Sequence, residues 1–255
     1  MTTGFRTLTG VLWPRDAVVH MVRQTSRTFD ALLARSGWKA LAFMVLSIFI
    51  LWHIYVPVHE LLHVAACILT GGTAETLHLQ PRYGANLLKH VFPLVVPATD
   101  YAGRLTSFSV PNDAAYALVD IFPYLPSLPG FALIVCAGRR QSAPLFGAGL
   151  LLAYAPVLGV TGDWYEACSL MTTRIATWID PSLPDRILVS DDVFRSVSEL
   201  RAAGALNAWT WMLVIGGQLL AVYLVLVMLA AQVALTHARF PPAAASPNQD
   251  SRGRS

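Results

Sequence analysis

Two histidines and a glutamate stand within five consecutive positions of an apolar stretch, as His59-Glu60-Leu61-Leu62-His63. Residues four apart lie on one face of a helix, so both imidazoles can bind a single zinc ion. Glu60 adjoins the first histidine and can act as the general base for water activated at that metal. In a chain of 255 residues with seven histidines, about 0.003 such patterns are expected by chance. The spacing therefore predicts a zinc site of the hydrolytic kind.

These ionisable side chains are costly inside an apolar segment. A charged residue at the centre of a membrane helix costs about 2.5–3.5 kcal/mol on insertion scales, and such residues usually face a functional interior. An alternative is that the histidines form hydrogen bonds between packed helices without any metal. We favour metal binding, because three ionisable residues within five positions are hard to explain by helix packing alone.

The composition indicates a membrane protein. Hydrophobic residues make up 55% of the chain and charged residues 13%, with a mean hydropathy of +0.53, whereas an average soluble domain carries about 25% charged residues. These values exclude a disordered chain, a disulfide-rich secreted module and an ordinary cytosolic domain. A helix needs about 20 apolar residues to cross the hydrocarbon layer. Four segments meet this condition, at about residues 38–70, 114–137, 143–162 and 209–237.

The regions that flank these spans differ from them in composition. Residues 1–37 carry five arginines and two aspartates, and Val18, Val22, Phe29 and Leu33 recur with a spacing close to that of one helical face. The C-terminal tail is rich in Pro, Ala and Ser, which predicts disorder. We therefore expect three parts, an amphipathic N-terminal segment (1–37), a polytopic membrane domain (38–237) and a disordered tail (238–255).

The distribution of charge predicts an orientation. Arginines gather in the N-terminal segment, in the Arg139-Arg140 turn and in the tail, and the positive-inside rule places these parts in the cytoplasm. The connection 163–207 carries seven acidic residues against four arginines, as a translocated loop would. Both termini are then cytoplasmic, and the Arg- and Ala-rich composition indicates a bacterial inner (plasma) membrane. A net charge of +3, with no run of more than two basic residues, excludes a nucleic-acid surface.

The connection between the first two spans is too apolar for a simple loop. Residues 76–80 and 105–110 alternate between apolar and polar side chains, as half-buried strands do. The sequence therefore predicts an all-α membrane protein with about four transmembrane helices, an N-terminal amphipathic helix and a small strand-like, membrane-associated insertion after the first span.

A catalytic zinc ion usually has a third protein ligand and leaves its fourth position for water. The best candidate is Asp163, because the predicted topology puts the end of the third span on the same side as the end of the first. Glu166 follows one helical turn later, as an alternative ligand or as a hydrogen-bond partner of a histidine ligand. Asp120 precedes the prolines of the second span and is a further candidate, as a ligand, a cavity-lining acid or a hydrogen-bond acceptor. A role for Asp163 as a helix N-cap stays open.

With these residues in place, the sequence resembles the site-2 protease family of intramembrane zinc metalloproteases. The resemblance rests on the H-E-x-x-H motif in a membrane helix, the helix end at Gly71-Gly72, the strand-like segment that follows, and Gly162-Asp163 near the end of a later span. Trp164 follows the aspartate where the family usually has glycine, which marks a divergent member.

The resemblance implies zinc bound by His59, His63 and Asp163, with Glu60 as general base, and cleavage of a membrane-embedded peptide. We therefore predict an intramembrane zinc metalloprotease whose partners are a membrane-protein substrate and the lipid bilayer. The alternative is a non-proteolytic membrane scaffold, or a pseudoprotease, with a metal site. The Glu60→Gln variant separates the two, because a protease would keep zinc and lose turnover, whereas a scaffold would keep its function.

Overall fold

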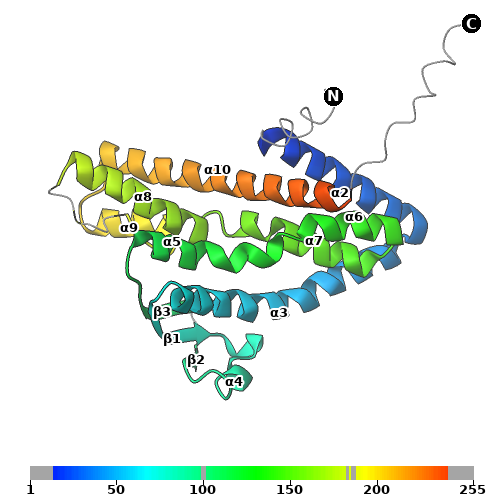
Figure 1. Ribbon diagram of the computed structural model, residues 1–255, viewed down its shortest axis with the longest axis horizontal. Coiled ribbons are helices and arrows are strands. Elements are labelled where there is room, and N and C mark those ends of the chain that lie inside the picture. Colours follow the sequence, from blue (N-terminus) through cyan, green and yellow to red (C-terminus); the bar gives the residue numbers. More distant parts are fainter. Residues whose placement is uncertain (1–13, 99–101, 182–183, 185–187, 241–255) are drawn as a thin grey trace, which may run out of the picture.

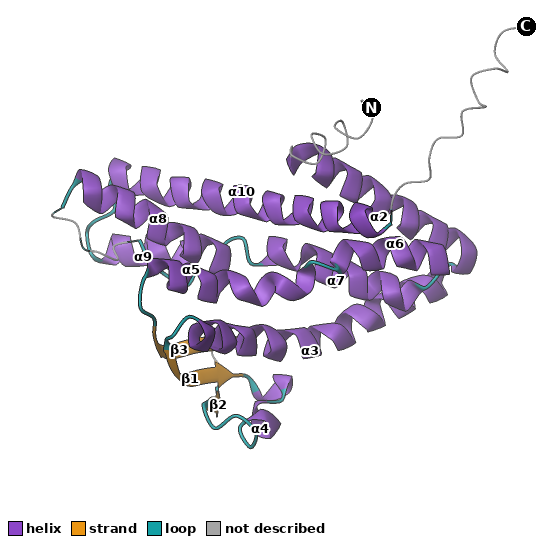
Figure 2. Cartoon of the chain, viewed as in Figure 1, coloured by secondary structure: helices purple, strands orange, loops and turns teal. Residues whose placement is uncertain are grey.

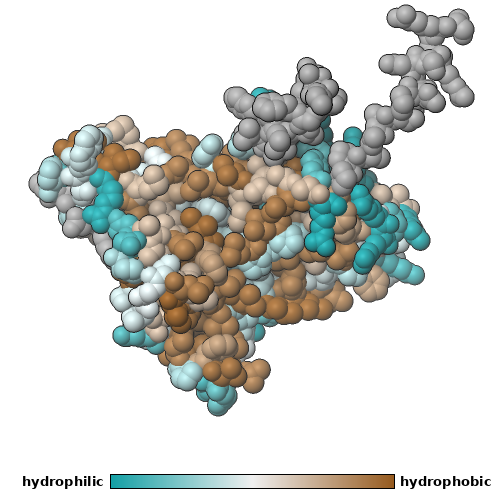
Figure 3. All heavy atoms as spheres, viewed as in Figure 1, coloured by the Kyte–Doolittle hydropathy of each residue, from teal (hydrophilic) through white to brown (hydrophobic). Residues whose placement is uncertain are grey.

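The computed structural model describes residues 14–98, 102–181, 184 and 188–240, so residues 1–13 of the predicted amphipathic segment and the tail from residue 241 lie outside it. Long helices form a bundle with a small sheet packed on one side (Figure 1 and Figure 2). Apolar side chains cover much of the sides of the bundle, and the most hydrophilic ones gather toward its ends (Figure 3). Four helical stretches are long and apolar enough to cross a membrane, namely Trp38–Leu69, Asp113–Arg140, Ala143–Ile179 and Ala208–Arg239. The predicted all-α membrane fold is confirmed.

The N-terminal helix α2 (Pro14–Ser36) packs against α6 (Gly130–Arg140) and α10 (Ala208–Arg239). It is helical as predicted, and Val18, Phe29 and Leu33 of the predicted face are partly buried against the core of the bundle. Met21 is fully buried, whereas Val22 of the predicted face is 47% exposed. The reason is that α2 contacts other helices of the bundle, so these neighbours determine which of its side chains are buried.

The first span is a single helix, α3 (Trp38–Leu69), which carries both histidines of the motif. Pro57 lies inside it and does not divide it. The helix ends as predicted at a glycine, because Gly71 has a φ of +82° and donates its N–H to the Ile68 carbonyl oxygen (3.0 Å). This turn leads the chain directly into the sheet.

The predicted insertion is a three-stranded sheet with the strand order β2-β1-β3. Strand β1 pairs with β2 in parallel and with β3 in antiparallel orientation, so β3 is an edge strand of the described sheet. Leu77 and Val95 of the sheet belong to one buried cluster with Val64 of α3, which fixes the sheet against the first span. The segment comprises β1 (Thr73–Leu79), a 3-10 turn (Pro81–Tyr83), α4 (Ala85–Leu88), β2 (Val95–Pro97) and β3 (Gly103–Ser109).

The second span is interrupted between α5 (Asp113–Ile121) and α6 by a 3-10 segment (Phe122–Ser127) that is rich in proline. Proline has no backbone N–H and cannot continue the helical hydrogen bonds. The buried Gln232 of α10 compensates in part, because its side chain accepts from the Phe131 N–H (3.3 Å) and donates to the Ala153 carbonyl oxygen (3.0 Å). Irregular backbone at this depth is tolerated because neighbouring helices supply such partners.

The third span is also interrupted, between α7 (Ala143–Leu158) and α8 (Asp163–Ile179). The helix α7 ends at Leu158, close to the predicted end of this span at about residue 162, and α8 begins after a short break, packs along α10 and belongs to the same candidate stretch, Ala143–Ile179. Asp163 therefore lies inside the spanning stretch, and the acidic connection includes α8 and a further helix, α9 (Val193–Ala202). Buried polar residues of α8, such as Ser169, lower the mean hydropathy of this segment, so its sequence resembles that of a loop.

Candidate metal centre

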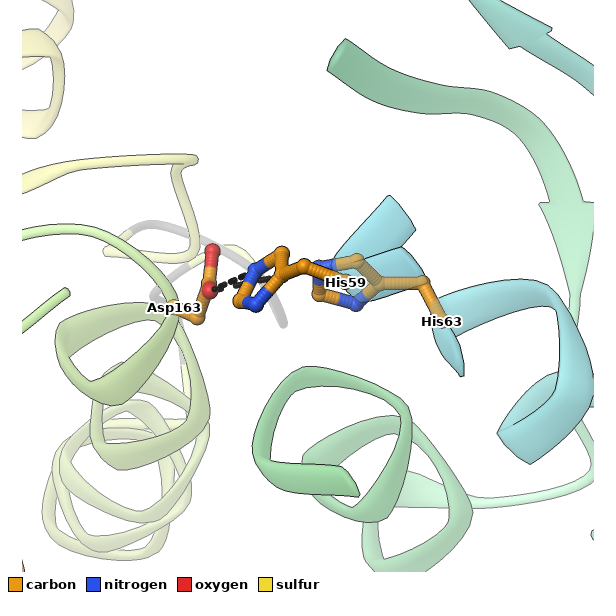
Figure 4. A group of neighbouring side chains, drawn as sticks. All are labelled: His59, His63 and Asp163. Atoms are coloured by element: carbon orange, nitrogen blue, oxygen red, sulfur yellow. Dashed lines mark hydrogen bonds and ion pairs between the residues drawn. The ribbon is translucent and has the colours of Figure 1, made fainter. Parts of the chain in front are cut away.

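The two histidines of α3 meet the first residue of α8. His59 Nε2 lies 3.0 Å from Asp163 Oδ2, and His63 Nε2 lies 3.9 Å from the same oxygen. One donor atom from each of the three side chains lies within 4.8 Å of the others, so the group could hold a metal ion. Figure 4 shows Asp163 facing His59, with His63 beside it. The three residues that the sequence singled out as ligands are thus brought together.

The second ring nitrogen of each histidine has its own partner. His63 Nδ1 lies 2.9 Å from the Val119 carbonyl oxygen. A carbonyl only accepts, so Nδ1 carries the proton and Nε2 has a free lone pair toward Asp163. His59 Nδ1 lies 3.2 Å from the Tyr55 hydroxyl, which can donate or accept. Both imidazoles are therefore oriented by a hydrogen bond at Nδ1, the nitrogen that faces away from Asp163, as metal-ligating histidines usually are.

Asp163 Oδ2 is contacted by the Tyr124 hydroxyl as well as by His59 Nε2. The Tyr124 hydroxyl donates to Asp163 Oδ2 (2.7 Å) from the 3-10 segment of the second span. Gly159, in the break of the third span, gives this tyrosine its space, because a Cβ at Gly159 would lie 1.6 Å from the Tyr124 hydroxyl oxygen. The N-cap residue of α8 is Gly162, and no side chain caps the helix, so the alternative role of Asp163 as N-cap is wrong. The breaks of both spans thus position one carboxylate.

Glu60 lies under the edge strand of the sheet. Glu60 is only 9% exposed, and a Cβ at Gly103 would lie 2.2 Å from Glu60 Cγ and 2.7 Å from Oε1. The β3 backbone can therefore approach the carboxyl group only because residue 103 is glycine. Sequence reasoning missed both Gly103 and Tyr124, because neither stands in a local pattern that indicates a site.

One cavity of about 920 Å³ connects these groups. It is bounded by α3, by most of β3, and by α5, α8 and the segment before α9. One arginine lines it, Arg104, whose Nη2 lies 2.6 Å from Asp191 Oδ2. The acidic residues among its lining are Glu60, Asp120, Asp163, Glu166, Asp191 and Asp192. The cavity therefore has a large excess of acidic groups over basic ones.

The two other acids considered from sequence also line this cavity but stand apart from the histidine pair. Glu166 Oε1 accepts from the Tyr116 hydroxyl (2.5 Å). Asp120 is 4% exposed, and its Oδ2 has no hydrogen-bond partner among the described residues. Within the described part of the chain, Asp163 is the acid that groups with both histidines. Asp120 and Glu166 are thus cavity-lining acids in this structure.

Fold and site together define a multi-pass membrane protein with a His-His-Asp group that could bind a metal ion. Comparison of the chain with known protein families, with curated proteins and with solved structures gave no match. The assignment of a function therefore depends on the site itself.

Proposed function

We propose that this protein is an intramembrane zinc metalloprotease related to the site-2 protease family. The single observation that supports this most is the grouping of His59, His63 and Asp163 inside helices that could cross a membrane, beside a cavity that His63, Asp163 and Glu60 line. Candidate metal ligands, a candidate base and space for a substrate then lie together where a membrane-embedded peptide could reach them.

The donor set fits zinc. Two imidazole nitrogens and one carboxylate oxygen are ligands that catalytic zinc sites use, with a fourth position left open for water. His63 has its Nδ1 committed to the Val119 carbonyl, so its Nε2 needs no change of tautomer to bind a cation. Zinc bound by these three residues would polarise a scissile carbonyl and make water a stronger nucleophile.

Glu60 is placed to move the proton. In the proposed reaction its carboxylate takes a proton from the attacking water and delivers it to the nitrogen of the leaving amine. Gly103 keeps the β3 backbone close against this carboxyl group and limits its freedom. Tyr124 has a supporting part, because its hydroxyl holds Asp163 Oδ2 in place.

The edge strand β3 offers a way to hold the substrate. It pairs with β1 on one side, its other side has no strand partner in the described sheet, and it lines the cavity over most of its length. An extended peptide can add to such an edge through main-chain hydrogen bonds. A helical substrate must in any case unwind before its amide can be attacked, because helical hydrogen bonds occupy the backbone.

Elemental analysis of the purified protein tests the metal. We expect about one zinc per chain in the wild type and its loss in His59→Ala, His63→Ala and Asp163→Ala. The matched control is His53→Ala, on the same helix but outside the group of His59, His63 and Asp163. A wild type that is offered zinc and binds none would overturn the proposal.

Glu60→Gln tests the reaction. Membranes that contain the wild type or Glu60→Gln are compared by sequencing newly formed peptide termini, with zinc measured in both proteins. We expect the variant to keep zinc and to lose cleavage by a factor of about 10²–10⁴. If zinc is bound and no terminus depends on Glu60, the site belongs to a scaffold or a pseudoprotease.

A further inference from the structure

A second polar cavity, of about 440 Å³, lies between α2, α6 and α10, away from the candidate metal centre. Its floor includes the aromatic ring of Phe131 and the side chain of Val135. No acidic residue is among the described residues that line it. The residues with basic or amide side chains around it are His20, Gln24, Arg27, Arg139, Gln141 and His237.

The two arginines of this pocket have no ion-pair partner in the described parts of the chain. Neither Arg27 nor Arg139 lies within ion-pair distance of a carboxylate there. Arg139 contacts the ring of Phe240 instead, with its guanidinium carbon 4.8 Å from the ring centre. Two unpaired guanidinium groups at one pocket attract an anion, and their forked N–H groups match the oxygens of a phosphate.

Arg139 is not required to complete the end of its helix. The Gln141 side chain donates to the Gly138 carbonyl oxygen (2.6 Å), and the backbone N–H of Ser142 donates to the Ala137 carbonyl oxygen (3.0 Å). These bonds satisfy terminal carbonyls that a basic side chain could otherwise serve. The guanidinium group of Arg139 is therefore not needed at the helix end, and its N–H groups have no carboxylate partner among the described residues.

The position of the pocket indicates which anion. Helix α6 ends at Arg140 and α10 ends at Arg239, so the pocket lies at the ends of two candidate membrane spans. At this level a membrane presents the phosphate groups of its lipids. Basic pockets between helix ends at the membrane surface are suited to anionic headgroups.

The pKa of His20, which contacts His237, is consistent with electropositive surroundings. His20 Nε2 lies 3.2 Å from His237 Nε2. Burial lowers the pKa of His20 below its usual value, and the positive charges of His237 and Arg27 lower it further. Positive charges that disfavour one more proton favour a bound anion.

We propose that this pocket binds the phosphate group of an anionic phospholipid. The phosphate lies between Arg27 of α2 and Arg139 of α6, and the acyl chains follow the apolar sides of the bundle. The bound lipid thereby links α2 to the ends of two spans. The proposal does not depend on the metal centre and stands or falls separately from the protease.

Native mass spectrometry of the detergent-purified protein tests the site. Phosphatidylglycerol, phosphatidylcholine and inorganic phosphate are each titrated, because the three probes separate an anionic headgroup from a zwitterionic one and from free phosphate. We expect the wild type to bind phosphatidylglycerol about tenfold more tightly than phosphatidylcholine. The variant Arg27→Gln/Arg139→Gln should lose this preference.

The matched control is Arg15→Gln/Arg35→Gln, which removes the same charge from exposed positions of α2 outside the pocket. We expect it to keep the preference. An equal loss in the control would show that general surface charge attracts the lipid and would overturn the proposal. Displacement of phosphatidylglycerol by an equal concentration of inorganic phosphate would also overturn it, because free phosphate would then be the ligand.

Discussion

The cavity beside α3 is lined by six acidic residues and one arginine, whereas the pocket beside α2 is lined by two arginines and two histidines. The first is built where two candidate spans are interrupted, and the second where two spans end. Irregular backbone and ionisable groups at membrane depth need protein partners, whereas groups at a helix end can reach water and headgroups. The two cavities therefore differ in the partners of their ionisable groups because one lies between interrupted spans and the other at the ends of spans.

The partners of the ionisable groups show the same contrast. At the candidate metal centre, His59, His63 and Asp163 contact Tyr55, the Val119 carbonyl and Tyr124, respectively. In the basic pocket, the guanidinium groups have no carboxylate partner in the described residues. We therefore expect small changes near the candidate metal centre to have large effects on cleavage and zinc affinity. Changes in the basic pocket should have moderate effects on lipid affinity, and these should depend on pH.

The largest effect in this comparison is expected for Gly103→Ala. The added methyl group would collide with the Glu60 side chain, which must move or displace β3. A displacement of about 1 Å in a catalytic group can cost roughly 100-fold in rate. We expect cleavage that depends on Glu60 to fall by about this factor while zinc content is unchanged, as measured by new peptide termini and elemental analysis.

The control for this variant is Ser107→Ala, an exposed position on the same strand that is not part of the cavity. It should leave both cleavage and zinc unchanged. A Gly103→Ala protein that cleaves normally would show that β3 does not constrain the candidate base, and the contrast between a tightly held site and a loose pocket would weaken.

A smaller effect is expected for Tyr124→Phe. The change removes the hydroxyl that donates to Asp163 Oδ2 and leaves the ring in place. Loss of a hydrogen bond to a metal ligand typically lowers metal affinity about 10- to 100-fold. Competition with a zinc chelator measures the affinity. Tyr154→Phe, which removes a hydroxyl near Thr25 instead, should have no effect on it, and equal affinities in all three proteins would contradict the role of Tyr124.

Local spacing explains what could be predicted from sequence at this site. The His59/His63 pair is separated by one helical turn, and Asp163 could be singled out because the predicted topology puts the end of the third span on the same side as the end of the first. Tyr124 and Gly103 act through contacts between distant segments, which no local pattern records. They could be found only once the breaks of the spans and the path of β3 were known.

The same limit explains why the sequence did not reveal that α8 packs inside the bundle. Polar residues such as Ser169 and Thr173 made α8 resemble a loop, although they are buried inside the bundle. Hydropathy treats every face of a span as facing lipid, and this assumption fails for a helix that lines a polar cavity. The four spans and the sheet were predicted because their patterns depend on length, alternation and turn residues alone.

The smallest expected effect is the pH dependence of the basic pocket. His20 contacts His237 of α10, and Arg27 of α2 and Arg139 of α6 line the same pocket. Burial and then the neighbouring positive charges hold the pKa of His20 below its usual value, so it is neutral at and above neutral pH. A bound anion favours the protonated form and raises this pKa, so by linkage the anion binds more tightly once the pH is low enough to protonate His20.

We therefore expect the affinity for phosphatidylglycerol to rise about threefold as the pH falls from about 8 to about 5.5. The lipid phosphate stays charged over this range, so the expected change comes from His20. His20→Gln should remove the dependence of the affinity on pH. Arg27→Gln should weaken binding at every pH, but its affinity should still rise as the pH falls. A wild-type affinity that falls toward acid would contradict an anion bound beside His20. It would also remove the contrast between the two cavities, because the positive charge of the pocket beside α2 would then not serve to bind an anion.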